Sequence, residues 1–249
     1  MPLWRYSGIQ EKRVSAWEFE PDFEIANSFV EYQAFQWPFF RDESWNTILH
    51  LLAKEGGEKV LRRLLEKHRA QTHSKHHIGQ TALSIAAEYG HETVVKLLLE
   101  RGNVEADLKD TRGVTPLSIA AEGGHEAVVM LLLRQDNVDA DLKDVGGWSP
   151  LSCAAFGGHE AVVRLLVDRG DVNPNSKDAG GYTPLSRAVL GGHQEIVKLL
   201  VSRNNVTADS MDIFGRTPLS YAIEREDYLV VRLLVEQSDV GVGSQDTDG

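Results

Sequence analysis

Histidines are the residues of this chain best suited to bind a metal ion or to transfer protons near neutral pH. His73 and His76 have a spacing that two metal ligands could use, and His68 and His77 lie close by. No cysteine or carboxylate lies among these residues or directly beside them, so no further ligand is close in sequence. We therefore interpret the segment as a solvated loop.

Four other histidines recur at one spacing, which favours a structural role for them. They follow a glycine at intervals of 34 residues: His91, His125, His159 and His193. Equivalent positions in a repeated unit predict equivalent contacts, here between the imidazole ring and groups of its own or the neighbouring unit. We expect these rings to hold the stacked units together.

Cys153 is the single cysteine of the chain, which excludes an internal disulfide. No base that could activate its thiol is evident, and we interpret it as a small buried apolar side chain. Glycine pairs such as Gly123-Gly124 follow predicted helices, whereas a phosphate-binding loop connects a strand to a helix. The sequence therefore predicts no catalytic site, no metal and no cofactor.

The composition limits the possible partners. The 249 residues are 42% apolar and include 37 acidic and 26 basic side chains, a formal charge of -11. The longest apolar run, 127–133, is far shorter than the ~18 residues of a membrane span. No basic stretch could neutralise phosphates, which argues against nucleic acids and anionic membranes as partners. The lone cysteine and an N-terminus unlike a secretory signal predict an intracellular location, cytoplasmic or nuclear.

The elements that position these residues belong to a repeated unit of 34 residues. Its most regular feature is Thr-Pro-Leu-Ser or a close variant, which starts at Thr81, Thr115, Ser149, Thr183 and Thr217. A degenerate copy starts at Thr47. We therefore predict six units within residues 46–238, with starts near residues 47, 81, 115, 149, 183 and 217.

The residue pattern of each unit predicts two short helices and an extended loop. Thr or Ser is a favourable N-cap, and Pro suits the first helical position because its missing N–H would be unpaired there. In the third unit we expect the first helix from Pro116 to about Glu122 and the second from near His125. Polar segments such as 136–147 predict turns that project as hairpin-like fingers.

This pattern resembles the ankyrin repeat. Residues 110–132 contain Asp-x-x-Gly-x-Thr-Pro-Leu, Ala-Ala, Gly-His and Val-Val-x-Leu-Leu in order, and the resemblance covers roughly residues 46–238. Two features depart from the family: Ser replaces His after Thr-Pro-Leu in every unit but the first, which keeps His50, and the unit is one residue longer. The resemblance implies an all-α solenoid of helix-turn-helix units with hairpin-like finger loops and one continuous core.

The two ends differ from the repeats. Residues 1–45 hold 12 of the 19 aromatic residues, which predicts a helical cap on the first unit, with a separate docking site as the alternative. The run 32–41 is similar to the helical stretch that precedes ankyrin arrays in large fungal proteins. Residues 239–249 predict a partial finger, either of a seventh repeat or of a tail that covers the sixth unit.

The resemblance also implies a concave surface, formed by finger tips and first helices, where residues not needed for stacking are free to vary. In units four to six these positions hold Trp148, Phe156, Tyr182, Leu190 and Phe214, which we name the concave strip. Equivalent or adjacent positions hold Tyr89, Val114, Ile213 and Arg216. Aromatic residues and arginine dominate binding hot spots, and a contiguous exposed apolar patch marks an interaction site. The alternative is that these are isolated surface residues, or residues that another segment covers.

The sequence thus predicts a non-catalytic protein that binds a protein partner of unknown identity through the concave strip. Two alternatives stay open. The chain could be the regulatory or sensor region of a larger multidomain protein, or a small-molecule binder or enzyme that uses the aromatic N-terminal segment.

Overall fold

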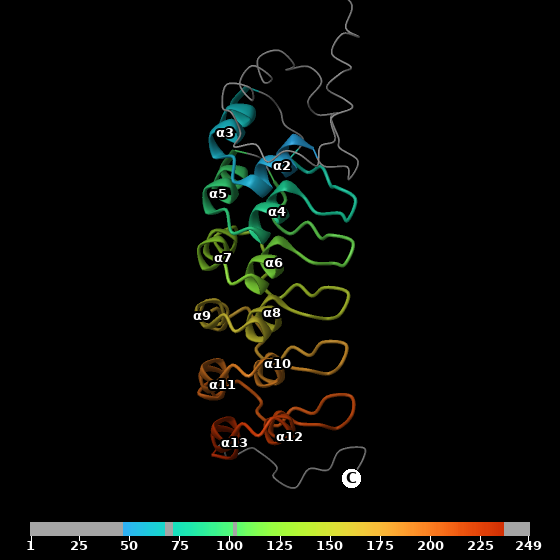
Figure 1. Cartoon of the computed structure of the whole chain (residues 1–249), viewed down its shortest axis with the longest axis vertical. Helices are drawn as coiled ribbons and strands as arrows, with labels where there is room; N and C mark the ends of the chain where they lie inside the picture. Colours follow the sequence, from blue (N-terminus) through green and yellow to red (C-terminus); the bar gives the residue numbers. More distant parts are fainter. Residues whose placement is uncertain (1–46, 68–71, 102–103, 237–249) are drawn as a thin grey trace, which may run out of the picture.

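A computed structural model describes residues 47–67, 72–101 and 104–236, which form twelve helices and no strand. The helices lie in two parallel rows that run the length of a stack, with the fingers projecting beside the first row (Figure 1). The first row consists of α2 (Ile48–Glu55), α4 (Ala82–Glu88), α6 (Pro116–Glu122), α8 (Pro150–Gly157), α10 (Pro184–Gly191) and α12 (Pro218–Glu224). The second row consists of α3 (Glu58–Lys67), α5 (Glu92–Arg101), α7 (Glu126–Leu133), α9 (Glu160–Val167), α11 (Gln194–Val201) and α13 (Tyr228–Val235).

The all-α solenoid expected from the repeats is confirmed by this arrangement. The N-terminal cap predicted over residues 1–45 and the partial finger predicted over 239–249 lie outside the described residues. The domain boundaries therefore stay predictions.

The first helix of each later unit begins at the predicted cap. In α4, α6, α8, α10 and α12 the N-cap hydroxyl accepts a hydrogen bond from the backbone N–H of the serine three residues on. For example, Ser186 N donates to Thr183 Oγ1 over 3.2 Å. Proline stands at the start of α6, α8, α10 and α12, where no helical N–H partner exists.

His50 shows what the serine of the later units replaces. Its Nδ1 accepts from the Thr47 N–H over 3.0 Å, so Nε2 carries the proton and donates to the carbonyl oxygen of Gln80 over 3.2 Å. That second bond joins the first unit to the next. In the third unit the shorter Ser118 instead places its Oγ 3.1 Å from Oγ1 of Thr115. The serine of the later units therefore contacts the N-cap of its own helix, whereas His50 also bonds to the next unit.

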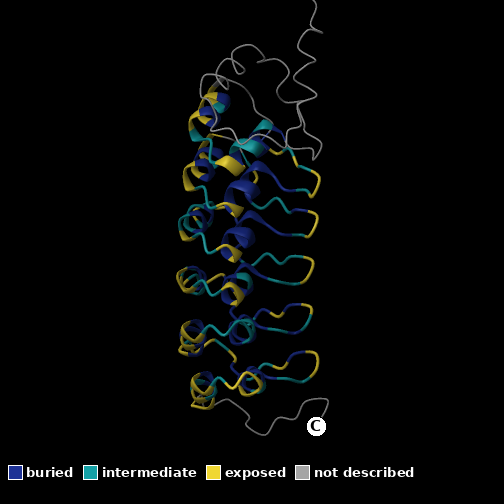
Figure 2. Cartoon of the chain, in the orientation of Figure 1, coloured by how far each residue is buried: buried dark blue, intermediate teal, exposed yellow. Residues whose placement is uncertain are grey.

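Buried residues lie inside the stack along the helices (Figure 2), and their apolar side chains form one continuous core. One leucine of each first helix is fully buried in units two to five: Leu83, Leu117, Leu151 and Leu185. The paired alanines Ala120-Ala121 and Ala154-Ala155 are also fully buried. Because a methyl side chain lets neighbouring helices approach closely, successive first helices pack directly on one another. This packing sets a constant spacing between the units.

The glycine-linked histidines join each unit to the preceding one, as the sequence predicts. Their Nε2 atoms bond to carbonyl oxygens 37 residues earlier: His91 to Lys54 (2.8 Å), His125 to Glu88 (2.9 Å), His159 to Glu122 (2.7 Å) and His193 to Phe156 (2.8 Å). A carbonyl only accepts, so Nε2 bears the proton in all four. In the sixth unit Asp227 takes this position, caps α13 through the Val230 N–H and accepts from Gln194.

The fingers are also joined in register. A backbone N–H of one finger donates to a carbonyl of the preceding finger at Thr111–Ile78, Val145–Arg112, Ala179–Gly146 and Ile213–Gly180, over 2.9 to 3.1 Å. Lysines add a second ladder, since Nζ of Lys75, Lys109, Lys143 and Lys177 each donates to the carbonyl 34 residues on. Side chains at equivalent finger positions are therefore arranged in a row along the stack.

Candidate functional site

The histidines of the first loop contribute to the backbone bonding of the fingers. Nε2 of His73 accepts from the Glu105 N–H over 3.3 Å, and Nδ1 of His76 accepts from the Gln80 N–H over 3.1 Å. His68 lies outside the described residues. Within residues 47–67, 72–101 and 104–236 no group of three potential metal ligands comes together. Over the same ranges, no helix combines the length and the apolar character that crossing a membrane requires.

Cys153 lies on α8 and is partly exposed, so it is less buried than the sequence suggested. Burial, together with the charges of Glu122 and Asp144, nevertheless raises the pKa of its thiol from 9.0 to about 12. The nucleophile in thiol chemistry is the thiolate, which is scarce at neutral pH in this setting. The geometry therefore favours the packing role predicted for this residue.

This environment gives a testable expectation for the thiol. A rise from 9.0 to about 12 lowers the thiolate fraction roughly a thousandfold below pH 9. At pH 8, Cys153 of the folded protein should react with a disulfide reagent at least a hundredfold more slowly than in denaturant. Stopped-flow absorbance measures both rates, and comparable rates would contradict the assigned environment.

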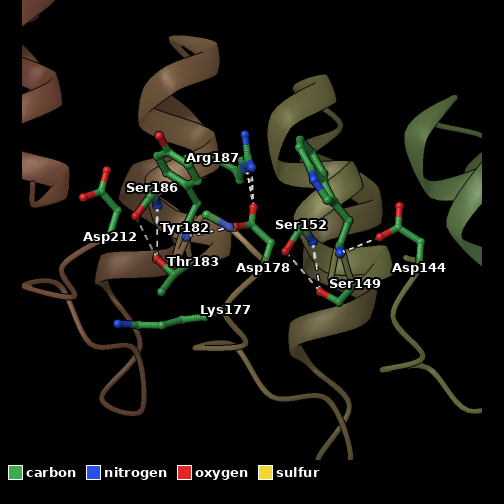
Figure 3. A network of polar contacts seen from close by, with 12 residues as sticks. Asp144, Ser149, Ser152, Lys177, Asp178, Tyr182, Thr183, Ser186, Arg187 and Asp212 are labelled. Carbon is green, nitrogen blue, oxygen red and sulfur yellow. Dashed lines mark hydrogen bonds and ion pairs between the residues drawn. The ribbon is translucent and has the colours of Figure 1, made fainter. Parts of the chain in front are cut away.

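The centre of the concave strip is an arginine held between two aromatic rings. Arg187 of α10 lies over both the Trp148 and the Tyr182 ring, with its Cζ 3.8 Å and 4.3 Å from their centroids. Its Nε donates to Asp178 Oδ2 over 2.8 Å, and Nη2 donates to the same oxygen. Figure 3 shows Arg187, Asp178 and Tyr182 gathered between neighbouring units. The two rings are thus held at a fixed spacing by a cation that belongs to the chain itself.

Asp178 links this arginine to its own finger. Its Oδ1 accepts from the backbone N–H groups of Gly180 and Tyr182, over 2.8 and 3.0 Å. The carboxylate side chain is 0% exposed and that of Arg187 is 15% exposed, so the ion pair is largely shielded from water. A shielded ion pair with several hydrogen bonds restrains both the finger and the helix.

A second polar group extends the strip into the sixth unit. The Tyr221 hydroxyl donates to Asp212 Oδ2 and lies 3.3 Å from the Tyr182 hydroxyl. Burial and the bond to Asp212 raise the pKa of Tyr221, so it stays a donor. Burial alone would raise the pKa of Asp212, but hydrogen bonds from Tyr221 and from the backbone of Arg216 and Phe214 lower it overall. Asp212 is therefore an ionised acceptor at neutral pH.

Exposed apolar side chains flank this hydrogen-bonded centre. Phe156 is 47% exposed and packs edge-on against Trp148, with ring centroids 5.5 Å apart. On the finger of the sixth unit, Ile213 is 64% and Phe214 48% exposed. Trp148, Tyr182 and Leu190 are all half-buried, and the last two pack against the core. The structure thus brings Trp148 together with Phe156 and, through Arg187, with Tyr182.

Two predicted site residues do not join this group. Val114 is only 8% exposed, because its side chain packs into the core, so the expectation of an exposed contact there is wrong. Tyr89 is exposed, but it stacks on His91 in the second unit, 6.2 Å away between ring centroids. Tyr89 ends α4, which lies two units from α8 along the stack (Figure 1).

Arg187 and Tyr221 are the members of the site that the sequence analysis missed. Both occupy the position directly after Thr-Pro-Leu-Ser, where the earlier units have Ile85, Ile119 and Cys153. The change from small or apolar side chains to arginine and tyrosine is a signal in the sequence. Its meaning depends on a contact between units, namely the placement of Arg187 against a ring of the preceding unit.

Short segments of known fungal proteins resemble part of the chain. Protein ssh4 of Neurospora crassa and protein ssh4 of Sclerotinia sclerotiorum are each 72% identical to it over 29 residues, and protein SSH4 of Coccidioides immitis is 69% identical over 29 residues. Each match covers 12% of this chain. The chain therefore spans about 6% of the length of these curated relatives.

A family model covers far more of the sequence. The model described as "Ankyrin repeats (3 copies)" matches residues 18–107, 102–178 and 171–246. The matched ranges together include every described helix. Proteins of this kind generally mediate protein–protein interactions and generally lack catalytic activity. The chain belongs to the ankyrin repeat family.

Proposed function

We propose that this protein binds a protein partner through the concave strip of units four to six and has no catalytic activity of its own. The observation that carries the proposal is the Trp148–Arg187–Tyr182 sandwich, with exposed Phe156 beside it. Aromatic side chains that are already fixed lose little conformational entropy on binding. Exposed rings on such a support are well suited to be anchors for a partner.

The direct test removes exposed rings and leaves the sandwich in place. Phe156→Ala combined with Phe214→Ala should weaken partner capture from extract of the native cell at least tenfold, because both lost rings are about half exposed. Quantitative pull-down measures the captured protein. The change Trp148→Ala with Tyr182→Ala should weaken capture at least as much, and circular dichroism should show that its helices persist.

A matched control uses an exposed aromatic residue in the other row of helices. Tyr228 of α13 is 78% exposed, so Tyr228→Ala should leave capture unchanged. Equal capture by the Phe156/Phe214 variant and the intact chain would remove the concave strip as the binding surface. Equal losses in the Tyr228 variant would point to the second row of helices.

The same surface is also compatible with a place in a larger protein. The curated relatives are far longer than the segment that matches, so a role as the regulatory region of a multidomain protein is a second candidate. We also propose an intracellular setting, because the single cysteine is a thiol with no partner for a disulfide within the chain.

A further inference from the structure

Arg216 carries hydrogen-bond donors that no acceptor satisfies within the described part of the chain. Its Nε is buried there without a hydrogen-bond partner, and the nearest carboxylate oxygen, Asp212 Oδ2, is 3.7 Å away. That oxygen already accepts from Tyr221, while Oδ1 accepts from backbone N–H groups of Phe214 and Arg216. The guanidinium is thus paired only loosely with Asp212, and 32% of the Arg216 side chain is exposed.

Two other polar side chains of the first row and its fingers do have hydrogen-bond acceptors. Arg187 directs two donors to the buried carboxylate of Asp178. Gln80, which occupies the position of Arg216 in the second unit, donates to Glu88 Oε2 over 3.0 Å. The equivalent pair in the sixth unit, Arg216 and Glu224, makes no such bond within residues 104–236. Arg216 therefore differs from Gln80 and from Arg187 in having a donor without an acceptor.

Aromatic rings hold this guanidinium in place. Its Cζ lies 4.7 Å from the centroid of the Tyr221 ring and 5.4 Å from that of Phe214. Rings on which a guanidinium stacks reduce the freedom it would lose on binding, and a planar guanidinium matches a carboxylate with parallel N–H donors. The carboxylate side chains beneath the strip, Asp178 and Asp212, are 0% and 1% exposed. The exposed side of this region thus presents rings and the Arg216 guanidinium, with the charge of exposed Glu224 acting on that guanidinium.

Building on the proposed function, we infer that the partner segment is acidic, with an aspartate or glutamate carboxylate that binds Arg216. The same segment places an apolar side chain against Trp148 and Phe156. These contacts lie two units apart, and packed helices are about 8–10 Å apart. An extended chain advances about 3.3 Å per residue, so the acidic and apolar residues should be about six positions apart.

The test begins with a phage-displayed library of random 16-residue peptides selected on the intact chain. We expect enriched peptides to contain Asp or Glu about six positions from a Phe, Leu, Ile or Trp. For synthetic peptides of the enriched sequences, replacing the acidic residue by its amide should weaken binding at least tenfold in fluorescence anisotropy. This comparison uses the unaltered protein and is independent of the stability of any variant.

Variants of the protein then locate the contact. Arg216→Gln should weaken binding of the acidic peptide at least tenfold. In this variant the acidic and amide peptides should differ in affinity by less than twofold. Arg232 is exposed on α13 in the other row, so Arg232→Gln, with the same change in charge, should leave affinity within twofold. Affinity should also fall with added salt, because the contact is between charges.

Three outcomes would overturn the inference. They are enrichment of peptides without acidic residues, amide peptides that bind as well as acidic ones, and equal affinity of Arg216→Gln and the intact chain. If neutral peptides are enriched and lose affinity with Phe156→Ala, the concave strip still binds a partner and only the acidic chemistry fails. A library that yields no specific peptide would also count against a linear acidic segment, while partner capture tests the proposed function separately.

Discussion

Asp178→Ala should lower the free energy of unfolding by about 3 kcal/mol, since removal of one partner from a buried ion pair leaves the other charge without compensation. Arg187 would keep its place between two rings but lose the acceptor of two donors. The backbone N–H groups of Gly180 and Tyr182 would lose their acceptor as well. Urea unfolding followed by far-UV circular dichroism measures this loss.

Asp144 provides the matched control for this prediction. It occupies the same register position one unit earlier, and its Oδ1 accepts from the Trp148 N–H over 2.8 Å. No arginine pairs with it among the described residues. Asp144→Ala should therefore cost only about 1 kcal/mol, as expected for one hydrogen bond. Equal losses for the two variants would show that the Asp178–Arg187 pair adds nothing to stability.

Gly124→Ala should also destabilise the stack by about 3 kcal/mol, through two separate effects. Gly124 has a φ of +70°, a left-handed conformation that costs a residue with a Cβ roughly 1–2 kcal/mol. In addition, a Cβ there would lie 2.3 Å from Nδ1 of His159, whose Nε2 is bonded to Glu122. The bonded ring cannot move away without losing its contact with the preceding unit.

A double-mutant cycle separates these two effects. In a His159→Ala background the collision is absent, so Gly124→Ala should then cost only the roughly 1–2 kcal/mol of backbone strain. His159→Ala alone should cost about 1 kcal/mol for the lost bond. Chemical denaturation of all four proteins gives the coupling energy. A coupling near zero would mean that the ring adjusts freely and that the collision has no effect.

The sequence determined the repeated architecture because its signals act over short distances. A Thr or Ser cap and the serine three residues later are fixed by the geometry of one helical turn, so Thr183 and Ser186 could be paired from spacing alone. The limits of the helix Pro116–Glu122 follow in the same way. The bridging role of His125 follows instead from its equivalent position in each repeated unit. Strict spacing of 34 residues then places equivalent side chains in rows.

The tertiary structure decided which variable side chains are exposed and which are paired. Val114 and Trp148 occupy the same repeat position, yet the smaller side chain fits into the core and the larger one extends over Arg187 of the next unit. Arg216 and Arg187 are both basic, but only Arg187 reaches a buried carboxylate at bonding distance. Such outcomes depend on side-chain size and on distances between units, which local spacing does not specify.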